Sequence, residues 1–99
     1  MLKVLFTINY EIETEKREDY LKTIRELKSL LKAEGLENYT AYEVKGKSNQ
    51  FVEQYTFLSD EAFENFDDNT DERINILINK ITDLAVNRST KYTTLTEVI

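Results

Sequence analysis

The stretch LKVLFTINYEI, residues 2–12, decides the fold class. Every even-numbered position in it is apolar: Leu2, Val4, Phe6, Ile8, Tyr10 and Ile12. A period of two is typical of a β-strand with one face against a core, because successive side chains point to opposite faces of a sheet. We therefore expect a first strand whose even-numbered face packs against helices.

A helix is expected directly after this strand. Thr14 is placed to act as its N-cap, acidic residues fill the turn after it, and Gly35 is placed to end it in a left-handed conformation. Between these two residues, apolar side chains recur at helical spacing: Tyr20, Leu21, Ile24, Leu27, Leu30 and Leu31. This pattern predicts one amphipathic helix that lies on the first strand.

Three further segments read as strands. Residues 39–46 and 50–58 are rich in aromatic and β-branched side chains, and the polar residues 47–49 between them suit a hairpin turn. Residues 91–99, KYTTLTEVI, are dense in Thr, Tyr and Val. We expect this last segment to close the domain as a strand.

The region between the hairpin and the last strand predicts a helix in two pieces. Ser59 is placed to cap a short first piece, and Asn69 or Thr70 is placed to cap the second. The second piece has an apolar stripe with residues three and four positions apart: Ile74, Leu77, Ile78, Ile81, Leu84 and Ala85. Ile76 lies off this stripe and is expected on the surface.

The order β, α, β, β, α, β predicts one ferredoxin-like α+β domain over residues 1–99, with an antiparallel four-stranded sheet and its helices on one face. The other face then carries Leu5, Thr7 and Asn9 from the first strand. The remaining strands add to this face some of Tyr39, Ala41, Val52, Thr56, Thr93 and Leu95. Because exposed apolar patches of this kind usually mark an interface, we expect a second copy to cover it as a homodimer.

Composition excludes several classes of function. The 99 residues include no Cys, His or Trp, so zinc sites, haem sites and thiol chemistry of the usual kind are not expected, and we predict no metal and no cofactor. No apolar stretch is long enough for a membrane span, and no signal peptide is visible, so we expect a cytoplasmic protein. The formal charge of −6 argues against a nucleic-acid partner.

An RNA-recognition domain has the same element order and is the main alternative at this point. Phe6 and the pair Phe51-Val52 stand where such domains have signature residues. However, Ser48, Asn49 and Gln54 replace the Gly and the two aromatics that the strand-three signature needs. Phe6 also belongs to the helix-facing stripe, so we interpret residues 47–57 as a barrel strand.

The chain resembles the dimeric α+β-barrel superfamily, which includes the antibiotic biosynthesis monooxygenases. The resemblance rests on the element order and on TFLSDEAFENF, residues 56–66, an aromatic followed by Ser, an acid and Ala-Phe. It implies a dimer whose sheets close a barrel, in some members around a cavity for an aromatic substrate. It also implies that Asn9 matches an Asn of the haem-degrading members and that Phe57 stands about where they have a Trp. The stretch around Ile76 falls where those members have a haem-ligating His, and nothing in it can ligate haem iron in that way, so no haem is expected.

The sequence leaves three functions open. The first is binding of a small apolar or aromatic molecule between sheet and helices, with Asn9, Tyr55 and Phe57 as candidate ligand contacts. The second is a cofactor-independent monooxygenase or isomerase, in which Asn9, Glu53 or Tyr55 would be the catalytic candidates, because a carboxylate in an apolar cavity has its pKa raised towards neutrality. The third is a protein-interaction module that uses the acidic segment 60–72.

Overall fold

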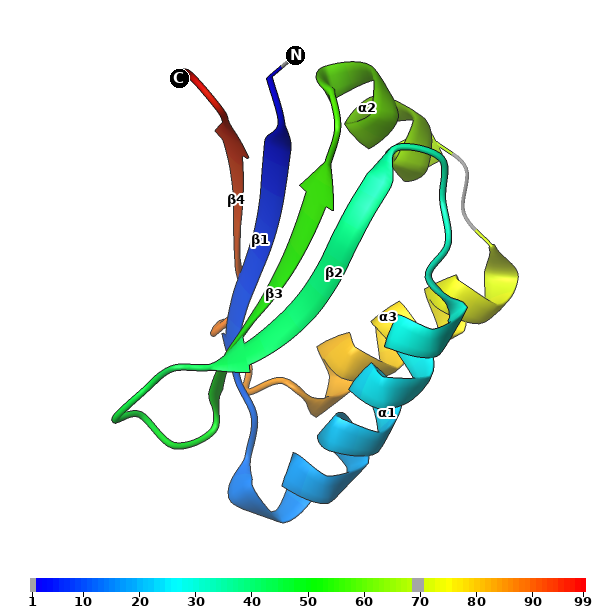
Figure 1. The fold of residues 1–99 in the computed structure, drawn as a ribbon. Coiled ribbons are helices and arrows are strands. Elements are labelled where there is room, and N and C mark those ends of the chain that lie inside the picture. Colours follow the sequence, from blue (N-terminus) through cyan, green and yellow to red (C-terminus); the bar gives the residue numbers. More distant parts are fainter. Residues whose placement is uncertain (1, 69–70) are drawn as a thin grey trace.

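The computed structural model describes residues 2–68 and 71–99 and confirms the predicted ferredoxin-like pattern (Figure 1). Its elements are β1 (Val4–Glu11), the 3-10 turn η1 (Thr14–Lys16), α1 (Arg17–Leu30), β2 (Leu36–Glu43), β3 (Gln50–Phe57), α2 (Asp60–Asp68), α3 (Glu72–Leu84) and β4 (Lys91–Thr96). The four strands form one antiparallel sheet in the order β2-β3-β1-β4. The second helical segment is split in two, as expected.

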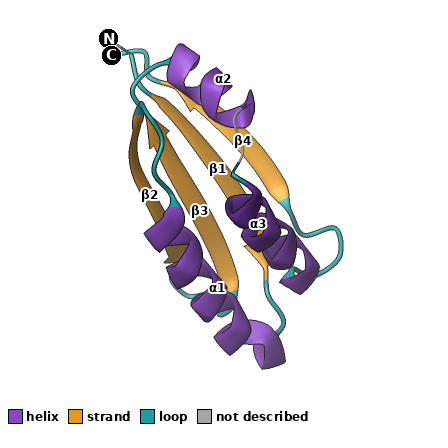
Figure 2. Ribbon diagram, turned by 90° about the vertical axis from the view of Figure 1, so that its right-hand side faces the viewer, coloured by secondary structure: helices purple, strands orange, loops and turns teal. Residues whose placement is uncertain are grey.

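All three helices lie on one face of the sheet (Figure 2). The even-numbered residues of β1 point towards them: Val4 and Tyr10 are buried, while Phe6 and Ile8 pack against the core. Ile12, just beyond the strand, is buried as well. The alternation that predicted the first strand therefore also predicted which of its faces is covered.

The strand β3 lies in the middle of the sheet and shows the clearest alternation of burial. Phe51, Glu53, Tyr55 and Phe57 are buried on the helix side, and the residues between them are only partly buried. An apolar face interrupted by one Glu is unusual, since carboxylates are seldom buried unless they are paired. Glu53 therefore needs hydrogen-bond donors around it.

The prediction for β2 needs a correction. Tyr39 and Ala41 were both among the residues proposed for the open face, but they pair with Tyr55 and Glu53 and so lie on the helix side. The register of β2 shifts between Leu36 and Asn38. Such an irregularity decides which face a strand's side chains occupy, and composition alone does not reveal it.

The open face consists of the side chains that pair across the strands on the side away from the helices. Leu5 pairs with Thr56 and Leu95, and Asn9 pairs with Val52. Thr93 also belongs to this face, opposite Thr7. None of these side chains is buried, and β4 is exposed along its whole length.

Two of the predicted helix ends are wrong. Thr14 begins the 3-10 turn instead of capping α1, and its hydroxyl accepts a hydrogen bond from the Asn49 side chain. The helix α1 ends at Leu30, before Gly35. Gly35 instead occupies the turn into β2 with a φ of +83°, where an added Cβ would collide with the Cβ of Ala62. Its role is to let this turn approach α2 closely.

The predicted cap of α2 is confirmed, whereas the predicted caps of α3 cannot be compared with the structure. Ser59 caps α2 as predicted, since its hydroxyl accepts a hydrogen bond from the Ala62 backbone. The cap of α3 is Asp71, whose carboxylate accepts from the Arg73 backbone; the predicted caps Asn69 and Thr70 lie outside the described residues. No helix within residues 2–68 and 71–99 is both long enough and apolar enough to cross a membrane.

Candidate functional site

A cavity of about 380 Å³ lies on the helix side of the sheet, where β1, β3 and β4 meet α2 and α3. Its lining is mainly aromatic and aliphatic, with a few polar groups: Phe6, Ile8, Tyr10, Glu53, Tyr55, Phe63, Phe66, Asn75, Ile78, Ile81, Thr82, Thr90 and Tyr92. Apolar cavities with a few convergent polar groups are typical small-molecule sites, and this volume is at the small end of their range. The cavity is therefore the candidate site.

The walls of the cavity come from elements distant in the sequence. Phe6 of β1 is central, with its ring centroid 5.5 Å from that of Phe63 in α2 and 6.1 Å from that of Tyr92 in β4. Tyr92 is 64% exposed, which places it at the rim. The rings thus form a continuous aromatic wall from the interior to the surface.

Glu53 is the unusual residue of this site. It comes from the middle of β3 and is only 2% exposed. Both of its carboxylate oxygens accept hydrogen bonds from phenols, one from Tyr10 at 2.7 Å and the other from Tyr39 at 2.5 Å. These two tyrosines come from β1 and β2, the two strands that flank β3 in the sheet. Three adjacent strands therefore hold the carboxylate in place.

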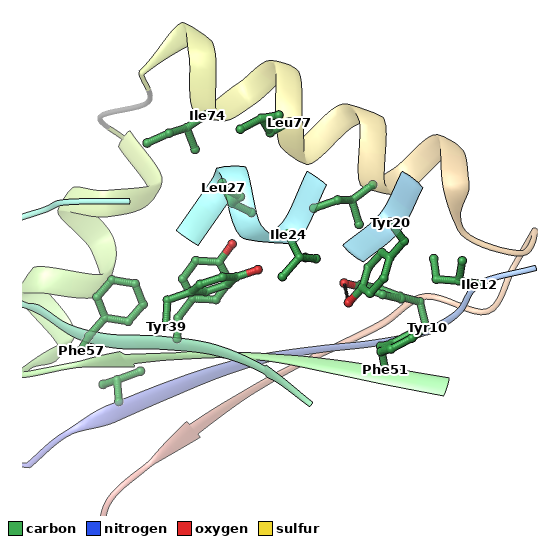
Figure 3. Close-up of a cluster of buried hydrophobic side chains, with 13 residues drawn as sticks. Tyr10, Ile12, Tyr20, Ile24, Leu27, Tyr39, Phe51, Phe57, Ile74 and Leu77 are labelled. Atoms are coloured by element: carbon green, nitrogen blue, oxygen red, sulfur yellow. Dashed lines mark hydrogen bonds between the residues drawn. The ribbon is translucent and has the colours of Figure 1, made fainter. Parts of the chain in front are cut away.

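A third tyrosine extends this network to the helix layer. The hydroxyl of Tyr20 in α1 lies 2.8 Å from the hydroxyl of Tyr10, and the two rings meet edge to face (Figure 3). Since the Tyr10 hydrogen is donated to Glu53, Tyr20 must donate to Tyr10. The result is a buried chain of phenols that ends on one carboxylate.

The environment of Glu53 shifts the titration of the whole network. Burial raises the pKa of Glu53, and the hydrogen bonds from Tyr39 and Tyr10 oppose that shift. Burial also raises the pKa of Tyr10 and Tyr39, and the charge on Glu53 raises both further. The phenols therefore remain protonated donors over the whole physiological range of pH.

The structure brings two of the predicted site residues together. Tyr55 is two positions from Glu53 on the same face of β3, and both line the cavity. Burial raises the pKa of Tyr55 too, with the Glu53 charge as the next cause. Phe57 is also on this face, but it is fully buried beneath Phe63 and Phe66 and does not line the cavity.

Asn9 is separated from the other candidates. It lies on the open face of β1, opposite Val52, and lines a different hollow of about 280 Å³ with Gln50 and Lys91. A molecule in the 380 Å³ cavity would be on the other side of the sheet from Asn9. Asn9 therefore lines a different hollow from Glu53 and Tyr55.

Several residues of the site were not predicted from sequence. Tyr10, Tyr20 and Tyr39 were interpreted as packing or as strand residues, whereas they hold Glu53. The available signal was the combination of a Glu in a buried strand with several Tyr on other elements, because a buried carboxylate needs donors. Tyr92 and Ile78, at the rim and on the helix wall, are identified only by the arrangement of the elements.

The acidic segment, residues 60–72, is the third region that the sequence singles out. Asp60, Glu61 and Glu64 are exposed, and Asp71 is occupied as the cap of α3 and by an ion pair with Arg73. Among the described residues, no group of three or more potential ligands is arranged for a metal ion. Asp71 therefore has a structural role at the start of α3, and the protein-interaction module expected for residues 60–72 stays a prediction.

The comparisons with known proteins concern the fold. No protein-family model and no curated protein matches the sequence. Among solved structures, a conserved protein from Methanosarcina mazei Go1 has a TM-score of 0.84 at 12% identity, with 99% of this chain and 95% of that one covered. SnoaB, a cofactor-independent oxygenase from Streptomyces nogalater, has a TM-score of 0.78 at 12% identity, with 98% and 94% covered.

A structure described as an antibiotic biosynthesis monooxygenase has a TM-score of 0.71 at 21% identity, with 100% of this chain and 98% of that one covered. The chain has the fold of the antibiotic biosynthesis monooxygenases. The resemblance drawn from the sequence is thereby confirmed at the level of the fold. At these identities a shared fold does not transfer an activity, which has to be argued from the site.

The stretch around Ile76, which the resemblance likens to the haem-ligating region, borders the cavity on one side of α3. Ile76 is 60% exposed on α3, and its neighbour two positions on, Ile78, is the one that lines the cavity. The helix thus turns one Ile inward and one outward. The sheet contributes Glu53 and the tyrosines to the polar groups of the cavity, and α3 contributes Asn75 and Thr82.

Proposed function

We propose that this protein binds a small aromatic molecule in the 380 Å³ cavity between the sheet and the helices α2 and α3. The observation that carries the proposal is the combination of an aromatic wall with one buried carboxylate, Glu53, on the same cavity. The wall supplies apolar contact, and Glu53 supplies a fixed hydrogen-bond acceptor that orients the ligand.

The test uses naphthalen-2-ylmethanol, a fluorescent aromatic alcohol of suitable size and chemistry. We expect saturable binding to the wild-type protein and loss of binding in Ile78→Trp, because the indole would fill the cavity. Ile76→Trp is the matched control, since it places the same bulk on the outer side of the same helix. Equal binding by both variants, with both folded by circular dichroism, would place the ligand elsewhere.

Catalysis is the second candidate, favoured by the position of a carboxylate inside an apolar cavity. Here Glu53 would take a proton from an activated C–H of the ligand, and burial, which raises its pKa, makes it a stronger base. For an oxygenase without a cofactor, the resulting carbanion supplies the electrons: a CH₂ group and O₂ become C=O and H₂O. The likeness to a cofactor-independent oxygenase in fold is consistent with this candidate.

The proton step can be tested apart from any oxidation. 2-Tetralone has an acidic ring methylene beside its aromatic ring, and exchange of these hydrogens with D₂O is followed by NMR under nitrogen. If Glu53 is the base, wild-type protein accelerates exchange and Glu53→Gln lowers the rate by about 100-fold or more. Tyr55→Phe tests the second candidate for the same step. Exchange at the buffer rate with wild-type protein would leave the cavity a binding site only.

We also propose that a second copy of the chain covers the open face. Leu95 is 49% exposed and Tyr42 is 50% exposed on this face, and Leu5 and Val52 adjoin them. Leu95→Lys should then shift sedimentation from dimer to monomer at micromolar concentration, whereas Ile76→Lys on the helix side should not. A wild-type protein that sediments as a monomer would contradict this part of the proposal.

A further inference from the structure

Among the described residues, the lining of the cavity has an acidic side chain but no basic one. Within the part of the chain that the structure describes, Glu53 is the one carboxylate in the lining, and no Lys or Arg lines it. The sequence has no His at all. Glu53 also takes part in none of the ion pairs among the described residues. A carboxylate removed from water without a cation is destabilising unless something else compensates for its charge.

The count of hydrogens indicates which form of Glu53 the network fits. Tyr10, Tyr20 and Tyr39 each have one phenol hydrogen, and the network has three hydrogen bonds, so an ionised Glu53 uses every hydrogen. A protonated Glu53 would add a fourth hydrogen with no acceptor within the network. The phenols thus stabilise an ionised Glu53 by hydrogen bonds. Because the phenols are neutral, they do not cancel its negative charge.

Glu53 can still accept hydrogen bonds from a ligand. Each carboxylate oxygen has two lone pairs and receives one phenol hydrogen, so one acceptor position on each remains. The other walls suit a positive charge as well, since the faces of aromatic rings attract cations. Phe6, Tyr55 and Phe66 provide such rings beside Glu53, with Tyr55 centred 5.8 Å from Phe6 and 5.7 Å from Phe66.

We infer that the ligand of this cavity is an organic cation, an amine with an aromatic body whose ammonium group binds Glu53. This inference rests on the proposed function, because it names the ligand class for the same cavity. The ammonium group donates to the free acceptor positions of the carboxylate and supplies the missing positive charge. The body of the ligand then lies along the aromatic wall towards Tyr92 at the rim.

Three probes of one size separate the charge from the shape: naphthalen-2-ylmethylamine, naphthalen-2-ylmethanol and 2-naphthoate. At neutral pH these are a cation, a neutral alcohol and an anion on the same ring system. We expect the amine to bind about tenfold more tightly than the alcohol, since hydrogen bonds to charged groups are roughly twice as strong as neutral ones. The carboxylate probe should not bind, because it would meet Glu53 as a like charge.

The variant Glu53→Gln should remove the preference for the amine and leave the alcohol within about threefold of its wild-type affinity. Glu64→Gln is the matched control: it removes one exposed acid from α2 and so corrects for general attraction of cations to a protein of net charge −6. The preference should persist in this control and in about 0.5 M NaCl, since a buried pair is screened much less than a surface one.

The outcomes separate the two claims. Equal affinity of amine and alcohol for the wild-type protein would overturn the cation inference while leaving the proposed cavity site intact. Failure of all three probes to bind would overturn the proposed site itself. If Glu53→Gln does not fold, the three probes on the wild-type protein in about 0.5 M NaCl still decide the matter, because salt removes general attraction of the amine and screens a buried pair much less.

Discussion

The two faces of the sheet are built from the same four strands but differ in chemistry. The helix side has a dense aromatic core, the cavity and Glu53, whose carboxylate is held by phenols from neighbouring strands. The open side has Leu5, Val52 and Leu95 beside polar residues, none of them buried. An acid buried on the covered face destabilises the fold and needs an explanation. Polar residues on the open face need none, because they are not buried.

This contrast shows how candidate residues can be ranked. Asn9 and Glu53 both looked plausible in the sequence, yet Asn9 pairs across the open face and Glu53 lies inside a cavity. Cavities concentrate ligands and strengthen electrostatic interactions, since they exclude water. Substitutions can test whether the two faces differ in energy as they do in structure, from the largest expected effect to the smallest.

Phe57→Ala should have the largest effect on stability. Phe57 is fully buried, with its ring centroid 5.4 Å from Phe63 and 5.3 Å from Phe66. Deleting such a ring lowers the free energy of unfolding by about 3–5 kcal/mol. Its neighbour Thr56 lies on the open face, so Thr56→Ala should lower it by less than about 1 kcal/mol. Urea unfolding of both variants measures the difference, and similar losses would contradict the assignment of faces.

Tyr39→Phe should have the next largest effect, because it removes one donor from the buried Glu53. Hydrogen bonds to charged groups contribute about 1.5–3 kcal/mol, and we expect a loss in this range. Tyr42→Phe is the matched control on the same strand, since Tyr42 is 50% exposed on the open face. Its unfolding free energy should change by less than about 0.5 kcal/mol. A neutral Tyr39→Phe would show that the phenol does not support the carboxylate.

The pH dependence of stability should differ in sign between two glutamates. The pKa of Glu53 is raised above 4.5, so from pH 4.5 upward the folded state keeps a proton that the unfolded state has released. Stability of the wild type relative to Glu53→Gln should therefore fall as pH rises through this window, by at most about 1.4 kcal/mol per pH unit.

Glu43 provides the opposite case at the hairpin end of β2. Hydrogen bonds from Arg17 and from the Asn49 backbone lower its pKa to about 2. Stability relative to Glu43→Gln should therefore rise with pH between about 2 and 4.5, although Glu43 is exposed and the effect is small. Thermal unfolding of each variant beside the wild type, above pH 4.5 for Glu53→Gln and between about pH 2 and 4.5 for Glu43→Gln, checks both signs, and curves parallel to the wild type would contradict them.

Periodicity and element order were enough to predict the fold. Alternation in residues 2–12 indicated the covered face of β1, the order of elements indicated the topology, and Ile76 was correctly placed on the surface. The Ser59 cap was also predicted from local chemistry, since an N-cap is a matter of a few neighbouring residues. Strand periodicity, element order and helix caps are features that short-range sequence patterns determine.

The site could be predicted only in part, because it depends on register. Glu53 and Tyr55 were recognised as neighbours on one face of β3, as the structure has them. The donors to Glu53 were missed, since Tyr39 reaches the covered face through an irregularity in β2. Tyr20 joins through the packing of α1 on the sheet, and no spacing in the sequence encodes this contact.

Methyl NMR of the protein titrated with naphthalen-2-ylmethanol decides between the two faces without any substitution. The Ile78 and Ile81 methyls lie on the cavity wall, while those of Leu5 and Leu95 lie on the open face. If the cavity beside Glu53 is the binding site, the methyl signals of Ile78 and Ile81 shift with saturation and those of Leu5 and Leu95 stay in place. Shifts confined to Leu5 and Leu95 would contradict the cavity proposal and move the site to the open face.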